Sequence, residues 1–104
     1  MKKTRAIFRE EIWDIKYQES VIVDNEEVAG SHDHSTRTIA IDKNLAEFEI
    51  FEAHIHEASH ALFPDVCETI IGLVSHELAL FLWKLGYRKG FITPTPKKKA
   101  AKKK

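Results

Sequence analysis

The amino-acid sequence predicts a small α+β fold, in which an N-terminal antiparallel β-sheet packs on an antiparallel pair of helices. The chain has 104 residues, of which 43% are hydrophobic, and this is enough for one domain with a small core. Residues 6–23 and 36–42 alternate between apolar and polar side chains, as strands do. Residues 45–62 and 67–86 instead repeat apolar side chains at steps of three and four, which indicates two helices.

The predicted strands lie in the first part of the chain. Residues 6–23 alternate imperfectly and break at 18–20, so they predict one or two strands, although 9–15 also fits the spacing of a short helix. Residues 24–35 are polar and rich in turn-forming side chains, which predicts a loop. Residues 36–42 alternate cleanly and predict a strand.

The first helix is expected over residues 45–62. Asn44 and Glu47 have the spacing of a capping box, which favours a helix that starts there. Apolar residues recur along one side and predict a buried stripe, so the histidines of this helix are expected to face away from the core. The stripe consists of Leu45, Phe48, Phe51, Ile55, Ala58 and Leu62.

The second helix is expected over residues 67–86 and is apolar nearly all round. This pattern predicts either the centre of the fold or an interface, such as that of a homodimer. Gly86 is placed to end the helix as a C-cap. Only residues 63–66 connect the two helices, so we expect them to form an antiparallel hairpin.

The charges divide the chain into a domain, residues 1–92, and a basic tail, residues 93–104. The net charge is zero, but six of the 16 basic residues lie in 97–104. This leaves 10 basic and 16 acidic residues in the body, whose net charge is −6. A lysine run of this kind predicts a disordered, solvated tail that makes at most weak contact with nucleic acid.

The composition also bears on location. No apolar run approaches the ~20 residues that cross a bilayer, and the basic start of the chain lacks the apolar segment of a signal peptide. We therefore expect a cytoplasmic protein without a membrane partner. The single cysteine, Cys67, excludes an internal disulfide and a cysteine-rich zinc site, so any metal would be held by histidines and carboxylates.

The first predicted helix carries the motif H-E-x-x-H at His56, Glu57 and His60. A spacing of four places the two imidazoles one turn apart on the same face, where they can bind one metal ion. Glu57 lies beside them, outside the coordination sphere, where it can take a proton from a zinc-activated water. The motif therefore predicts a zinc site with two histidine ligands and a general base.

A catalytic zinc site needs a third protein ligand. The predicted helical hairpin places Glu68 beside the His60 end of the first helix, so Glu68 is the expected third ligand. Three neighbouring side chains stay open as alternatives for this role: Cys67, His76 and Glu77.

The remaining histidines are weaker candidates for residues of the site. His54 lies on another face of the helix from the motif and is expected at the surface. His32 and His34 lie in the predicted loop and are expected to be solvated, with contact to the site as the alternative. Tyr87 or a loop histidine is a candidate for stabilising an oxyanion.

The order of these features is similar to that of the small phage-encoded zincin-like metallopeptidases. The similarity covers about half of the chain, in the stretches RTIAID, HIHEASHAL, FPDVCE and LALFLWKLGYR. It implies a zinc ion, a minimal zincin-like fold with a peptidase-like site and, for a phage protein, the host cytoplasm as location. The family's metal ligands correspond to His56, His60 and Glu68, and its catalytic base to Glu57. Cys67 departs from the serine that the family has before this glutamate.

Two functions follow from the sequence as expectations. The first is a zinc metallopeptidase, in which Glu57 drives the attack of water on a peptide or amide carbonyl. Its protein or peptide substrate would bind along the edge of the strand that ends at Asp42. The second is a non-catalytic protein-interaction module, in which zinc supplies folding energy that a small core lacks.

Overall fold

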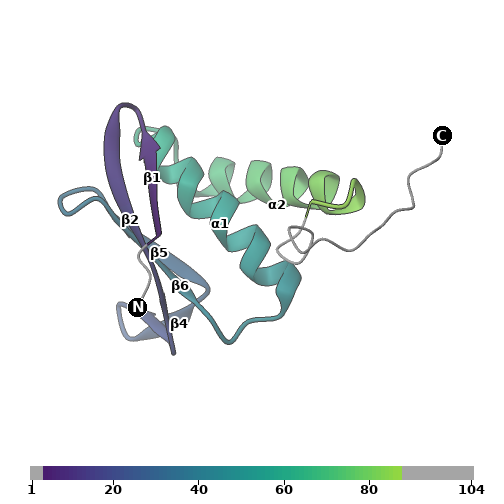
Figure 1. Cartoon of the computed structure of the whole chain (residues 1–104), viewed down its shortest axis with the longest axis horizontal. Helices are drawn as coiled ribbons and strands as arrows, with labels where there is room; N and C mark the ends of the chain where they lie inside the picture. The colour runs from purple at the N-terminus through teal and green to yellow at the C-terminus, as the bar shows by residue number, and fades with distance from the viewer. Residues whose placement is uncertain (1–3, 88–104) are drawn as a thin grey trace.

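The computed structural model describes residues 4–87 and has the predicted α+β class (Figure 1). The strands in this range are β1 (Thr4–Phe8), β2 (Glu11–Gln18), β3 (Val21–Val23), β4 (Glu26–Val28), β5 (Gly30–Asp33) and β6 (Thr38–Asp42). The helices are α1 (Glu47–Leu62) and α2 (Glu68–Lys84). The predicted basic tail, and with it the end of the predicted domain, lies outside the described residues.

Four strands form one sheet in the order β1-β2-β6-β5, and β3 and β4 form a separate hairpin. The prediction of an antiparallel sheet is correct only in part: the β1–β2 and β5–β6 pairs are antiparallel, but β2 and β6 are parallel. The parallel pair arises because β3, β4 and β5 lie between β2 and β6 in the chain, and this long connection lets β6 return in the same direction.

The strand order also corrects the expected substrate edge. The strand that ends at Asp42 is β6, which is paired with β2 on one side and with β5 on the other. It therefore has no free edge for a substrate. Within residues 4–87, β5 is the strand nearest α1 that keeps one edge unpaired.

Two-residue turns with positive φ close the β1–β2 and β3–β4 hairpins. Arg9 and Glu10, with φ of 54° and 69°, connect β1 to β2, and Asp24 and Asn25, with φ of 53° and 68°, connect β3 to β4. Positive φ at both central residues is typical of type I′ turns, whose twist matches that of paired strands. The alternative of a short helix over 9–15 is therefore wrong, because the chain reverses within it.

The predicted loop over 24–35 is also wrong, because it contains β4 and β5. Its polar composition hides the strands, and β5 is fixed instead by pairing along its whole length with β6. After β5, the hydroxyl and the amide of Ser35 donate to Oδ1 of Asp33 at 2.6 and 2.9 Å. These hydrogen bonds hold the pKa of Asp33 below its usual range and fix the turn that follows His32.

The core lies between the sheet and α1. Its buried members are Trp13, Ile39 and Ile41 from the sheet and Ala53 and Ala61 from α1. The small side chains of α1 allow the helix to approach the sheet closely. Between these alanines, the same face of α1 buries two polar residues of the H-E-x-x-H motif.

These two residues are Glu57 and His60, which are only 6% and 7% exposed. The prediction that the histidines face away from the core is therefore wrong for His60, whereas His54 and His56 are partly exposed. The bulky Phe48 and Phe51 of the predicted stripe contact Trp83 of α2, with ring centroids 5.2 and 5.5 Å apart. The helix α1 packs on two sides, and these two stripe residues serve the contact with α2, whereas Ile50, which lies outside the predicted stripe, packs on the core.

The observed ends of the two helices agree only in part with those predicted from the sequence. The predicted capping box of Asn44 is wrong, because α1 starts later and the amide of Ala46 donates to Oε1 of Glu49 at 3.3 Å. The Asn44 side chain instead donates to Glu19 at 2.9 Å. Gly86, with a φ of 98°, follows the last turn of α2, as predicted for a residue that ends the helix.

The helix α2 is an outer layer of the molecule. It packs chiefly on α1, which separates it from the sheet (Figure 1). Its buried residues are Ile71, Ser75 and Ala79, whereas most of its large apolar side chains are exposed. The alternative that this helix forms the centre of the fold is therefore wrong. Neither helix within residues 4–87 has the length and apolar character that crossing a bilayer requires.

Candidate metal centre

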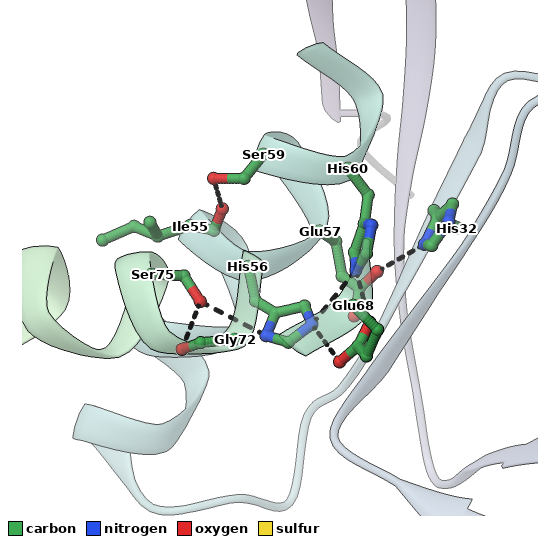
Figure 2. A network of polar contacts seen from close by, with 9 residues as sticks. All are labelled: His32, Ile55, His56, Glu57, Ser59, His60, Glu68, Gly72 and Ser75. Atoms are coloured by element: carbon green, nitrogen blue, oxygen red, sulfur yellow. Dashed lines mark hydrogen bonds and ion pairs between the residues drawn. The ribbon is translucent and has the colours of Figure 1, made fainter. Parts of the chain in front are cut away.

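Side chains of His56, His60 and Glu68 converge where α1 meets α2 (Figure 2). Nε2 of His60 is 2.7 Å from Oε1 of Glu68 and 3.3 Å from Nε2 of His56. Nε2 of His56 is in turn 3.1 Å from Oε2 of Glu68. Three potential metal ligands from two helices therefore point at one place.

The antiparallel register of the helices brings Glu68 to the motif. Glu68, at the start of α2, contacts His60. Eight residues later, His76 contacts Glu52, which lies eight residues before His60 in α1. The short connection between the helices predicted this register, and the structure places Glu68 where the sequence analysis expects it. The role of these residues as ligands stays a prediction.

The distances between the three groups fit a tetrahedral zinc ion. Zinc binds imidazole nitrogen and carboxylate oxygen at about 2.0–2.2 Å, so tetrahedral angles separate neighbouring ligand atoms by about 3.3–3.5 Å. The separations of 3.1 and 3.3 Å approach this range, and the hydrogen-bonded pair at 2.7 Å would open slightly. The donor set therefore suits zinc, with one coordination position left over.

Ser75, a fully buried residue of α2, orients His56. Its Oγ lies 3.3 Å from Nδ1 of His56 and donates to the carbonyl of Gly72, also at 3.3 Å (Figure 2). Because the hydroxyl donates to that carbonyl, its lone pair accepts the Nδ1–H of His56. This arrangement keeps the proton on Nδ1 and leaves Nε2 free for a metal.

Replacing Ser75 with Ala is expected to weaken zinc binding by about 10–100-fold, because His56 loses the partner that fixes its tautomer. Competition with a chromophoric zinc chelator measures this affinity. The matched control is Ser59→Ala in α1, whose hydroxyl donates to the carbonyl of Ile55 at 2.7 Å and has no contact with the site. Equal affinities of Ser75→Ala and the unchanged chain would show that Ser75 does not orient the ligand.

Glu57 lies beside the three converging groups, against the edge strand β5. Nδ1–H of His32 donates to its Oε1 at 2.8 Å, which pairs an otherwise buried carboxylate. Gly30 makes room for it, since a Cβ there would lie 3.1 Å from Cγ of Glu57 and 3.0 Å from the carbonyl oxygen of Ala40. The sheet thus holds the carboxylate in one orientation.

His32 is the site residue that sequence analysis assigned to a solvated loop. Its ring stacks on His60, with centroids 4.3 Å apart, and it points at Glu57 from β5 (Figure 2). His32, Glu57 and His60 also form a second group of potential ligand atoms within 4.8 Å. His34 contacts His32 edge-on at 5.3 Å. The available signal was the H-x-H spacing, which places two histidines on one face of a strand.

The alternatives for the third ligand lie outside this centre. Cys67 is exposed and belongs to neither group of potential ligands in residues 4–87. Nδ1–H of His76 donates to Oε2 of Glu52 at 2.8 Å, away from the motif. Glu77 is exposed on the outer side of α2. The structure therefore brings only Glu68 of these candidates to the motif.

Two further candidates are also elsewhere. His54 lies away from the centre, as predicted, and its Nε2 is 2.7 Å from the hydroxyl of Tyr17 in an exposed contact. Partial burial raises the pKa of that tyrosine. Tyr87 follows the end of α2, whereas Glu68 is at its start. A role for Tyr87 in stabilising an oxyanion at this centre is therefore excluded by the length of α2.

A cleft of about 580 Å³ opens beside the centre. The side chains of His56, Glu57, His60 and Glu68 lie at one part of its wall, together with His32. The β3–β4 hairpin, β5 and the first half of α1 supply the rest, including the apolar Val23, Val28 and Leu45. The potential metal ligands and the Glu57 carboxylate thus share one solvent-accessible space.

Comparison with known proteins adds no assignment. The chain matches no protein-family model, no curated protein and no solved structure. A proposal for its function therefore depends on the geometry of its own residues.

Proposed function

We propose that this chain is a zinc-dependent hydrolase of peptide or amide bonds. The observation that carries the proposal is the convergence of His56, His60 and Glu68 beside the buried carboxylate of Glu57, in the wall of a cleft. Structural zinc sites are closed by four protein ligands, whereas catalytic sites have three and keep one position open. Three ligands next to an accessible space support the catalytic type.

The chemistry divides between the metal and the surrounding side chains. Zinc held by the three ligands would lower the pKa of water to near 7 and polarise a carbonyl group. A carboxylate oxygen of Glu57 takes the proton from the attacking water and then gives it to the leaving amine. His32 holds Oε1 of Glu57 during this exchange, so the carboxylate does not need to reorient.

The edge strand β5 supports a peptide as substrate. Its backbone keeps one edge unpaired within residues 4–87, and Gly30, Ser31 and His32 of this strand line the cleft. An extended peptide that adds to this edge gains backbone hydrogen bonds without a second lobe of protein. This replaces β6 as the expected docking strand and brings the peptide backbone next to Glu57.

The second candidate is a protein-interaction module in which zinc has a structural role. The exposed apolar face of α2 favours this alternative, because such a face is typical of binding surfaces. A zinc ion between α1 and α2 would then hold that face in place.

Metal analysis together with peptide cleavage tests the proposal. Full-length protein purified without chelators is expected to contain about one zinc ion per chain and to cleave members of an internally quenched peptide library. Removal of zinc with 1,10-phenanthroline is expected to stop cleavage, and added zinc to restore it. Stoichiometric zinc without cleavage would support the structural alternative, and absence of zinc would contradict both candidates.

A further inference from the structure

The outward face of α2, together with the residue that follows its last turn, carries many exposed apolar side chains. Leu73, Phe81 and Leu85 are 60%, 58% and 59% exposed. The other exposed apolar residues of this helix are Ile70, Val74, Leu78 and Leu80. The largest contiguous apolar patch of a typical monomer measures about 300–600 Å², and it is often a binding surface. Seven large apolar side chains, each about half exposed, lie on this one helix and its last turn, which makes the face a candidate binding surface.

This face is separate from the candidate metal centre. Residues of α2 that contact the centre, Glu68 and Ser75, are on the side turned toward α1. The buried positions Ile71 and Ala79 lie on the same inner side. The exposed apolar residues therefore contribute nothing to the site, and no other element within residues 4–87 covers their outward surface.

Two charged residues interrupt the apolar face. Glu77 and Lys84 are exposed and seven residues apart, which places them two helical turns apart along nearly the same line. Neither has a hydrogen bond or an ion pair with another residue in the range 4–87. If a second copy of α2 lies antiparallel to the first, Glu77 of each helix can therefore lie beside Lys84 of the other.

We propose that this face binds a second copy of the chain, with the two α2 helices antiparallel. A two-fold axis between Leu80 and Phe81 places Glu77 level with Lys84 of the second copy, and the symmetry repeats the pair. The same axis places Leu80 opposite Phe81 of the second copy. An axis at Glu77 would oppose two glutamates, so the charges select one register.

The occupant is a second copy because of this self-complementarity. A membrane-binding helix keeps its charged residues on the polar side, whereas Glu77 and Lys84 lie within the apolar face of α2. An isologous dimer buries the same surface patch of both copies, so this patch must be complementary to itself. The apolar and charged residues on the outward face of α2 meet this condition. The proposal does not depend on the catalytic role of zinc.

Sedimentation equilibrium of the full-length chain tests the proposal. We expect a dimer for the unchanged chain and a monomer for Phe81→Glu, which buries a charge at the axis. Ile22→Glu, at an exposed apolar position of β3, is the control and is expected to stay dimeric. Circular dichroism and zinc content verify that each variant is folded. A monomeric unchanged chain at millimolar concentration, or a dimeric Phe81→Glu, overturns the proposal.

Charge reversal tests the register. Glu77→Lys alone and Lys84→Glu alone are each expected to raise the dimer Kd about tenfold or more, because like charges then face each other twice. The double variant Glu77→Lys/Lys84→Glu is expected to return to the Kd of the unchanged chain. Failure of the double variant to recover contradicts the antiparallel pair. If the unchanged chain is a monomer and binds vesicles of phosphatidylserine and phosphatidylcholine, the apolar face binds membranes and the dimer proposal is wrong.

Discussion

Replacing Glu57 with Gln is expected to lower kcat for peptide hydrolysis by about 10²–10⁴-fold and to leave the zinc content unchanged. The amide has nearly the same shape as the carboxylate, and its oxygen can still accept the hydrogen bond from Nδ1–H of His32. The fold around the side chain is therefore retained. What disappears is the base that takes a proton from water. Cleavage of an internally quenched peptide and metal analysis of the same sample measure the two effects.

The matched control is Glu52→Gln, since Glu52 is also on α1 and lines the same cleft, but its carboxylate is paired with His76. This variant is expected to retain activity within a few-fold of the unchanged chain. Equal loss in both variants would indicate a general effect of charge in the cleft and not a base at Glu57. Full activity of Glu57→Gln would contradict the proposed mechanism while leaving the zinc site intact.

The sequence predicted the fold best where periodicity and connection length act together. Both helices and the β6 strand follow from their apolar spacing, and the hairpin follows from the short segment between α1 and α2. The β5 strand was missed because its sequence, GSHD, has no apolar alternation, and only the pairing with β6 defines it. Such long-range pairing leaves no local pattern from which it can be predicted.

The same contrast between local patterns and long-range pairing explains which residues of the site could be predicted. Glu68 was placed correctly because an antiparallel hairpin with a short turn leaves little freedom of register. His32 was not, since it depends on β5 lying beside α1. The orientation of α1 was also wrong, because the alanines Ala53 and Ala61 carry a weak apolar signal although they are buried in the core with the sheet residues. Close packing of a helix on a sheet favours these small residues, whereas hydrophobic periodicity weights large ones.

Zinc is expected to raise the Tm of this protein by about 10–20 °C at a free concentration near 100 times its Kd. Binding to the folded state alone contributes about 2.7 kcal/mol under this condition. In a domain of this size, each kcal/mol shifts Tm by about 4–8 °C. His60→Ala is expected to abolish the shift, because His60 contacts both of the other proposed ligands. Differential scanning fluorimetry with zinc and with EDTA measures it.

The zinc-dependent shift, and not Tm itself, is the decisive quantity, since His60 is buried and its removal also leaves a cavity. If His60→Ala does not fold, the less buried His56→Ala is expected to show the same loss of response. His76→Ala removes a histidine from the same helix pair but outside the centre, and it is expected to keep the full shift. A shift that persists without His60 and His56 would place zinc elsewhere in the chain. A shift that depends on both, in a chain whose Glu57→Gln variant is inactive, would mean that one metal ion both joins α1 to α2 and serves the reaction.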